Sequence, residues 1–273
     1  MVKKIIFIAL AVLVSFPLLY LPAKAKNADP PDLPDSDLPE NNGVYPVPGH
    51  PELKLHVLSH PARGSRPAKP TPTPTSAPVL NCSLEDPDSS SVSGVTGWYL
   101  PPSFSYLLNS SSVPASVGAE NLTWIAQNGY LQWAEALSGQ VSVSFAGQTL
   151  STRARLDGQN IITWGRAASG TLGVTYIWTY GDGEVAEADT IMNKGYAWSW
   201  SDPDTWHGSV CAYPGSYDAQ NILTHELGHW FGTDDDYDQE FENNTMYGFG
   251  DVLETKKDTL TNGDITAVRS IYQ

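Results

Sequence analysis

The chain has 273 residues, of which 41% are hydrophobic and only 16% are charged, so it has enough apolar material for one sizeable core. Its formal net charge of −15 argues against nucleic acid and anionic membrane as partners, because both repel an acidic surface. The many carboxylates leave room for structural Ca2+ sites, although solubility alone accounts for such acidity.

The first 25 residues have the three parts of a secretory signal peptide. Two lysines precede an apolar run over about residues 5–21, and a small-x-small cleavage site ends at Ala25. An uncleaved membrane anchor is the alternative, but the run is short for a span and Pro17 interrupts it. We therefore expect a secreted, extracellular protein, monomeric and without membrane contact once residues 1–25 are removed.

Residues 26–91 form a proline-rich segment, which we interpret as a propeptide or a spacer. Few aromatic residues occur before about residue 80, and no periodicity of a helix or strand persists there. Such a sequence cannot bury enough apolar surface to order itself, although the apolar residues between His50 and His60 allow one short element. The histidines here, His50, His56 and His60, are therefore poor candidates for metal ligands.

Residues 92–273 have the composition and periodicity of one globular domain. The expected strands are Phe104–Leu108, Val141–Phe145, Asn160–Trp164, Leu172–Thr179 and Val185–Met192, and the expected helices are 114–137, 221–231 and 264–272. This order predicts an α+β fold, with one mixed or mostly parallel sheet of about five strands and three helices.

The sequence His225-Glu226-Leu227-Gly228-His229 has the spacing of a zinc-binding helix. Two histidines four positions apart share one helix face and can take two corners of a zinc tetrahedron. Glu226 is offset by one position, so it is placed to take a proton from a water on the metal rather than to bind the metal. The amide of a peptide is the obvious substrate, and a pair of solvated surface histidines is the alternative.

Three features after this helix support the metal site. Gly232 can adopt positive φ and end the helix sharply, and Asp235 stands three residues further on as a third ligand. Met246 follows within Asn243-Asn244-Thr245-Met246-Tyr247-Gly248. The acidic run over residues 234–242 has a second interpretation, because its carboxylates could instead bind Ca2+.

Taken together, these residues resemble the metzincin clan, with the pattern His-Glu-x-x-His-x-x-Gly-x-x-Asp followed by a methionine turn. The likeness is strongest to the matrixins and covers about residues 92–273. It rests further on motifs similar to that family's strands and last helix, at residues 98–106, 157–165, 187–193 and 260–272.

The resemblance implies a metzincin-like catalytic domain that binds Zn2+ through His225, His229 and Asp235. It implies that Glu226 is the catalytic base of an endopeptidase acting on a protein or peptide substrate. Most of the clan has histidine at the third position, so Asp235 is a departure that makes the zinc a weaker Lewis acid.

The resemblance also assigns supporting roles. Met246 would form the floor under the metal, and Asp264 would support the methionine turn, although a helix cap is the simpler interpretation of Asp264. Tyr247 would line a substrate pocket or only pack. The strand at Leu172–Thr179 would be the sheet edge along which an extended substrate pairs.

Cys82 and Cys211 are the two cysteines of the chain. In an exported protein, an even pair indicates a disulfide bond. In vertebrate matrixins a propeptide cysteine blocks the zinc, and Cys82 precedes the catalytic domain. Its neighbours do not match the Arg-Cys-Gly pattern of that switch, so we expect the disulfide.

Two other functions remain open. A zinc enzyme of another class would take its third ligand further along the chain, at Glu254, but Gly232 and Met246 would then have no role. A secreted, non-proteolytic binding or adhesion module would keep the fold without the activity, although the presence of both histidines and Glu226 argues against it.

Overall fold

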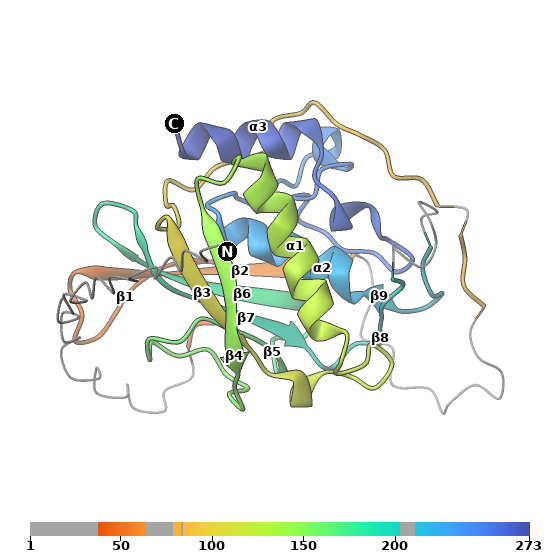
Figure 1. The fold of residues 1–273 in the computed structure, drawn as a ribbon, viewed down its shortest axis with the longest axis horizontal. Coiled ribbons are helices and arrows are strands. Elements are labelled where there is room, and N and C mark those ends of the chain that lie inside the picture. Colours follow the sequence, from red (N-terminus) through yellow and green to blue (C-terminus); the bar gives the residue numbers. More distant parts are fainter. Residues whose placement is uncertain (1–37, 64–78, 83, 203–210) are drawn as a thin grey trace, which may run out of the picture. The chain divides into compact units, whose positions relative to one another are not determined.

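A computed structural model of the protein describes residues 38–63, 79–82, 84–202 and 211–273 (Figure 1). The expected signal peptide lies outside the described residues. Within the described ranges, every helix is too short or too polar to cross a membrane.

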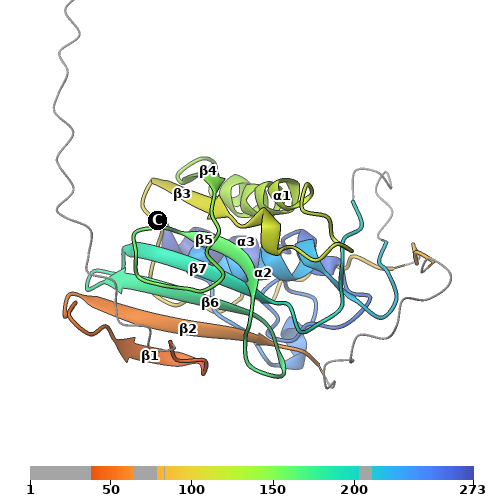
Figure 2. The same cartoon turned by 90° about the horizontal axis from the view of Figure 1, so that it is seen from below.

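The centre of the fold is a mixed sheet, which has seven strands within the described residues (Figures 1 and 2). The spatial order is β1-β2-β6-β7-β5-β3-β4. β3, β4, β5 and β7 run parallel, whereas β6 is antiparallel to both of its neighbours. In chain order the strands are β1 (Gly43–Pro46), β2 (Leu53–Pro61), β3 (Ser103–Leu108), β4 (Ser142–Gln148), β5 (Ile161–Gly165), β6 (Thr171–Tyr180) and β7 (Val185–Asn193).

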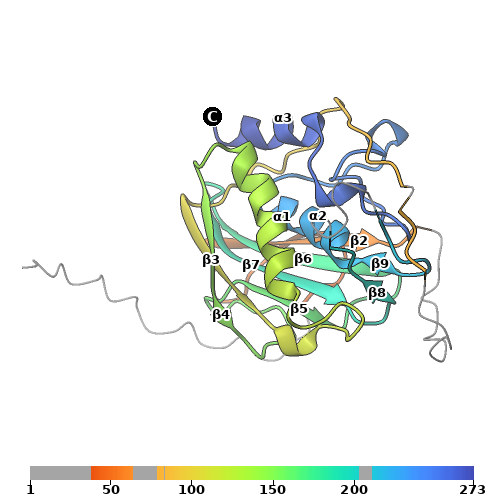
Figure 3. The ribbon, with the colours of Figure 1, turned by 45° about the vertical axis from the view of Figure 1, so that its right-hand side comes forward.

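In the described part of the chain, three α-helices accompany this sheet: α1 (Leu122–Ala136), α2 (Ala219–Trp230) and α3 (Asn262–Ile271). α1 and α2 pack against each other on one face of the sheet, and α3 contacts α1 (Figure 3). Short elements complete the fold: the 3-10 turns η1 (Ser110–Ser112), η2 (Gln239–Phe241) and η3 (Lys256–Asp258), and the paired strands β8 (Trp198–Ser199) and β9 (Tyr217–Asp218).

The α+β class, the three helices and the five strands expected in residues 92–273 are confirmed, with boundaries shifted by a few residues. The helix expected from Pro114 begins only at Leu122. The reason is local, because Gly118 has a φ of +89°, which is incompatible with a helix. The sheet is larger than the expected five strands, since β1 and β2 extend it.

The expectation that the proline-rich segment cannot order itself is wrong for residues 38–63. β2 pairs antiparallel with β6 along its whole length, and β1 pairs with β2. Leu53, Leu55 and Val57 alternate along β2 and are buried with Trp178 on the sheet face away from α2. The segment therefore obtains its buried surface from β6, a partner distant in sequence.

Candidate metal centre

α2 is fixed at both ends by side chains and by backbone geometry. Asp218 begins it by accepting hydrogen bonds from the backbone N–H groups of Gln220 and Asn221 at 2.9 and 3.0 Å. Gly232 ends it with a φ of +96°, and a Cβ there would overlap the carbonyl oxygen of Trp98. The chain therefore turns back on itself and returns Asp235 to the helix.

The three ligands predicted from the sequence lie together. The Nε2 atom of His225 is 3.1 Å from Oδ1 of Asp235, and that of His229 is 3.7 Å from the same oxygen. Both histidine side chains are fully buried and that of Asp235 is 4% exposed. The register that makes Asp235 rather than Asp234 or Asp236 the third ligand is the one in which these atoms converge.

Backbone carbonyls orient both imidazoles toward the same point. Nδ1 of His225 lies 2.8 Å from the carbonyl oxygen of Thr245, and Nδ1 of His229 lies 3.0 Å from that of Thr233. A carbonyl can only accept, so each Nδ1 carries the proton and each Nε2 presents a lone pair. This is the arrangement in which histidine binds a metal.

The polar atoms at the point of convergence need a partner that the protein does not supply. Nε2 of His225, Nε2 of His229 and Oδ1 of Asp235 are buried without a hydrogen-bond partner among the described residues. Each such atom costs about 1–3 kcal/mol if left alone. A divalent cation satisfies all three, and this nitrogen and oxygen donor set suits Zn2+.

Burial and neighbouring charges perturb the ionisation of these groups. Burial lowers the pKa of His225 to about 4, which favours the neutral, metal-binding imidazole. Burial by itself raises the pKa of Asp235, but the adjacent His229 and His225 outweigh it, so the pKa lies below its ordinary value. The site therefore holds a carboxylate beside a neutral His225.

Glu226 lies beside the ligands and is held by β6. Its Oε2 accepts a hydrogen bond of 2.6 Å from the Thr175 hydroxyl, whereas Oε1 has no hydrogen-bond partner in the described part of the chain. A Cβ at Gly173 would overlap Oε1, so glycine at this position of β6 leaves room for the Glu226 carboxyl group as it lies here. Burial raises the pKa of Glu226 to about 8, which suits a group that takes up and releases a proton near neutral pH.

Met246 contacts α2 at Gly228, and Asp264 accepts hydrogen bonds from the backbone on which Met246 lies. Met246 is fully buried, and its sulfur packs so closely on Gly228 of α2 that a Cβ there would overlap it. Asp264 has both of the roles considered from the sequence. It forms a capping box with Thr261 at the start of α3, and it accepts a 2.9 Å hydrogen bond from the backbone N–H of Thr245 beside Met246.

His60 lies beside these residues, although the sequence analysis placed it outside the candidate site. Its ligand atom lies within 4.8 Å of those of His225 and Asp235, and these three form the one such group within the described residues that could hold a metal ion. His229 falls outside that group and joins it only through its 3.7 Å approach to Oδ1 of Asp235. The side chain is fully buried, and its ring meets the ring of His225 edge-on with centroids 3.8 Å apart. The judgement that His60 is a poor ligand candidate followed from placing it in an unordered segment, and that placement was wrong.

The expectation that Leu172–Thr179 is a free sheet edge is also wrong. β6 contains this stretch, and β2 covers its outer side from Leu53 to Pro61. In the described part of the sheet, the edge strand on this side is β1 instead, and β4 is the other edge. Because β7 covers the other side, a further strand could pair with β6 only in place of β2.

The remaining sequence expectations concern cysteines and carboxylates. Cys82 and Cys211, both in described parts of the chain, form a disulfide bond, so the expected pairing is confirmed and neither thiol is available to bind a metal. Glu254, the rival third ligand, lies 3.4 Å from the Nζ atom of Lys256. In the acidic run, Glu242 pairs with Arg63 at 2.9 Å.

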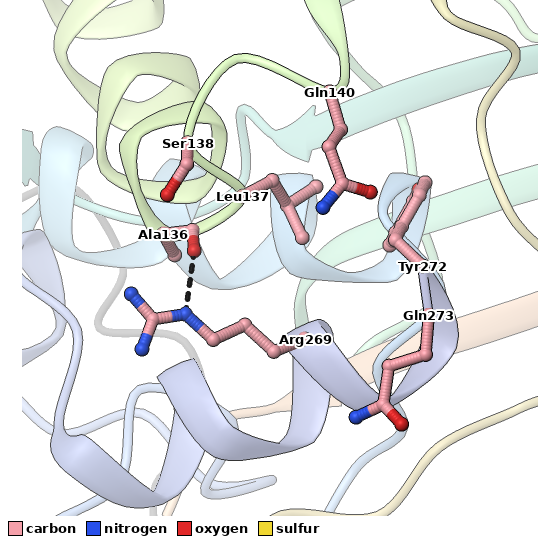
Figure 4. Close-up of a pocket in the computed structure, with 7 residues that line it drawn as sticks. All are labelled: Ala136, Leu137, Ser138, Gln140, Arg269, Tyr272 and Gln273. Carbon is pink, nitrogen blue, oxygen red and sulfur yellow. Dashed lines mark hydrogen bonds between the residues drawn. The ribbon is translucent and has the colours of Figure 1, made fainter.

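A surface pocket lies apart from these histidines, between the end of α1 and α3 (Figure 4). Arg269 crosses it and donates a 2.7 Å hydrogen bond from Nε to the carbonyl of Ala136. The residues that line it are Ala136, Leu137, Ser138, Gln140, Arg269, Tyr272 and Gln273. No histidine, cysteine, aspartate or glutamate lines this pocket, so it is not an alternative metal site.

Neither a protein-family model nor a curated protein sequence matches this chain.

Proposed function

We propose that this protein is a secreted zinc-dependent endopeptidase of the metzincin type, most similar to the matrixins. The observation that carries the proposal is the convergence of three unpartnered, buried donor atoms from His225, His229 and Asp235 beside Glu226. A sequence motif alone is compatible with solvated surface histidines. Full burial of both rings, each oriented by a carbonyl, argues against that alternative.

When bound at these residues, Zn2+ supplies the Lewis acidity that polarises a scissile carbonyl and an attacking water. Glu226 takes a proton from that water as its oxygen bonds to the carbonyl carbon. The same carboxyl group then gives the proton to the amide nitrogen as the C–N bond breaks, so the products are a carboxylic acid and an amine. The Thr175 hydroxyl orients Glu226 for both transfers through Oε2 and leaves Oε1 free.

Asp235 affects the strength of this chemistry. A carboxylate in place of a third imidazole lowers the net charge of a divalent-ion site by one unit, which weakens its Lewis acidity. Tyr237 donates a 3.2 Å hydrogen bond from its hydroxyl to Oδ2 of Asp235 and so leaves Oδ1 for the metal. The phenol hydroxyl withdraws part of the carboxylate charge and partly offsets the weakening.

The test is zinc binding and peptide cleavage by matched variants. Because β2 covers β6, we would assay the folded chain before and after a cut at an engineered protease site within residues 64–78. Glu226→Gln is expected to keep one zinc per chain and lose roughly 10²–10⁴-fold in cleavage of a quenched peptide library. Asp235→Asn should lose zinc affinity, whereas the control Glu254→Gln should retain both properties.

The rival functions predict different results. Zinc loss in Glu254→Gln but not in Asp235→Asn would indicate the other class of zinc enzyme. Equal cleavage by the cut wild-type chain and its Glu226→Gln variant, or none by either with zinc bound, would sink the peptidase proposal. The second of these results is the one expected of a binding or adhesion module.

A further inference from the structure

β2 brings its last residues to the level of the proposed catalytic base. In the antiparallel pairing of β2 with β6, His60 lies opposite Gly173, and Gly173 is the residue against which Oε1 of Glu226 packs. Leu58, two positions earlier, points to the same face of the sheet and belongs to the core that surrounds α2. The pairing register therefore places the His60 side chain on the face where the three proposed ligands converge.

The His60 ring has one nitrogen committed to the protein and one that is not. Its Nδ1 atom is buried and has no hydrogen-bond partner within the described ranges, whereas its Nε2 atom lies 3.3 Å from Nζ of Lys257. Nδ1 is therefore the nitrogen without a protein partner, and it can bind a metal in the tautomer that carries its proton on Nε2. In His225 and His229, likewise, one ring nitrogen has a partner in the protein and the other has none.

The loop after Met246 packs closely against the end of β2 at Gly250. A Cβ at Gly250 would overlap Leu172 and Ile222 and would lie 3.0 Å from Nε2 of His60, so glycine lets this loop approach all three side chains. Gly250 also donates a 3.1 Å backbone hydrogen bond to the Pro61 carbonyl and accepts one of 2.9 Å from the backbone N–H of Arg63. The end of β2 is therefore docked on this loop by backbone hydrogen bonds on both sides of the glycine.

Lys257 also contacts both this loop and the end of β2. Its fully buried Nζ atom donates to the carbonyls of Tyr247 and Phe249, both at 2.7 Å, and lies 3.3 Å from Nε2 of His60. Arg63, just past β2, donates a 2.9 Å hydrogen bond to the Tyr247 hydroxyl. The same loop thus holds β2 through His60, through the backbone and through Arg63.

We propose that His60 is a fourth protein ligand of the metal and that β2 occupies the place of a substrate strand, an inference that rests on the proposed zinc peptidase. Three imidazoles and one carboxylate fill a tetrahedral site, which is the pattern of a closed zinc centre rather than an open, catalytic one. An extended strand added to β6 is also how a peptide substrate would bind. The intact chain is therefore latent, with both the coordination position and the strand position occupied by its own residues.

Release of β2 requires only one break in the chain. The disulfide begins at Cys82, so a cut within residues 64–78 leaves β1 and β2 without a covalent link to the site. As long as the chain is intact, β2 competes with substrate at the high effective concentration of a tethered segment. After the cut it competes only at its bulk concentration, and dilution or a brief wash with mild denaturant separates it.

The first test counts imidazoles around the metal by X-ray absorption spectroscopy of the zinc-loaded protein. We expect three in the intact wild-type chain and two in intact His60→Ala, with at least roughly tenfold faster loss of zinc to a chelator in the variant. The matched control is His50→Ala, at a histidine of the same segment that pairs with Glu52 away from the site, and it should keep three.

The second test needs no substitution at His60, so it stands even if His60→Ala fails to fold. The chain with the engineered site is loaded with zinc, cut, and separated from the β1–β2 piece by size-exclusion chromatography. The imidazole count should fall from three to two, and cleavage of the quenched peptide library should rise on the order of 10²-fold.

The two proposals fail in different ways. Two imidazoles in the intact chain, with cleavage as fast as after the cut, would overturn latency through His60 and leave the peptidase standing. Three imidazoles without cleavage by the separated chain would support the ligand and overturn the peptidase. Absence of stoichiometric zinc from every form would overturn both.

Discussion

Two segments deliver histidines to one point of this molecule, and they do so by different physics. α2 brings His225 and His229 together through helical periodicity, which is a local property of five consecutive residues. β2 brings His60 to the same point through its register against β6, more than a hundred residues further along the chain. The sequence motif therefore identifies the two histidines on α2 but not the histidine on β2.

We expect the largest change in stability from removing the disulfide, which links the two segments covalently. Cys82 and Cys211 join the chain after β2 to the loop before α2 across 129 residues. Closing a loop of that length stabilises the folded state by about 5 kcal/mol in the chain-entropy model. We expect the Cys82→Ser, Cys211→Ser double variant to lose about that much free energy of unfolding, measured by urea denaturation.

The control is dithiothreitol, which should destabilise the wild-type protein and leave the double variant unchanged. A loss below about 1 kcal/mol would mean that the two segments are ordered without their covalent tie.

The second test measures how much the buried face of β2 contributes to the stability of the fold. Leu55 is 4% exposed and packs with Trp178 on the far face of the sheet, so Leu55→Ala should destabilise the fold by roughly 2–5 kcal/mol. Val44 in β1 is 61% exposed, and Val44→Ala should change stability by less than about 0.5 kcal/mol. Urea denaturation followed by tryptophan fluorescence measures both.

Equal effects of the two substitutions would show that β2 contributes little to the folded state. A strand of that kind could not hold His60 in place, so the result would also weaken the comparison between β2 and α2.

The sequence predicted the part of the site that depends on local spacing. His225, Glu226 and His229 follow from helical periodicity, and Gly232 with Asp235 follows from the need to end that helix and return. The five strands of residues 92–273 were visible for the same reason, because alternation and turn residues are properties of short windows.

The sequence did not predict the partner of β6. Residues 53–57 alternate as Leu-Lys-Leu-His-Val, but prolines surround them, and their apolar side chains find a core only against β6. Whether this segment is ordered depends on β6, because β6 provides the surface against which its apolar side chains are buried. The observable signal was the alternation itself, together with three histidines in a segment otherwise poor in functional side chains.

α2 and β2 also differ in what they bury, because α2 buries ionisable groups and β2 buries an apolar face. All twelve residues of α2 are buried, including Glu226, and its N-cap Asp218 is buried as well, whereas the face of β2 against Trp178 is apolar. Desolvation raises the pKa of Asp218 to about 6, and the charge of Asp218 in turn helps to raise the pKa of the nearby Asp258. The stability of the α2 region should therefore depend on pH in a way that packing of β2 does not.

The smallest effect we predict is this pH dependence. The folded-state pKa of Asp218 lies above its ordinary value of 3.8, so the folded protein binds more protons between about pH 4 and 6, and its stability falls as pH rises through that window. The group accounts for a loss of about 2 kcal/mol across the window. Asp218→Asn keeps a good N-cap and removes the titration, so its unfolding free energy should depend less steeply on pH than that of the wild type.

Urea denaturation at several pH values between 4 and 7 measures the difference in slope, with Asp258 left unchanged in both proteins. Leu55→Ala is the matched comparison, because it should lower stability by the same amount at every pH. Parallel pH profiles for wild type and Asp218→Asn would mean that Asp218 does not carry the dependence, and that the hydrogen bonds from Gln220 and Asn221 outweigh its desolvation.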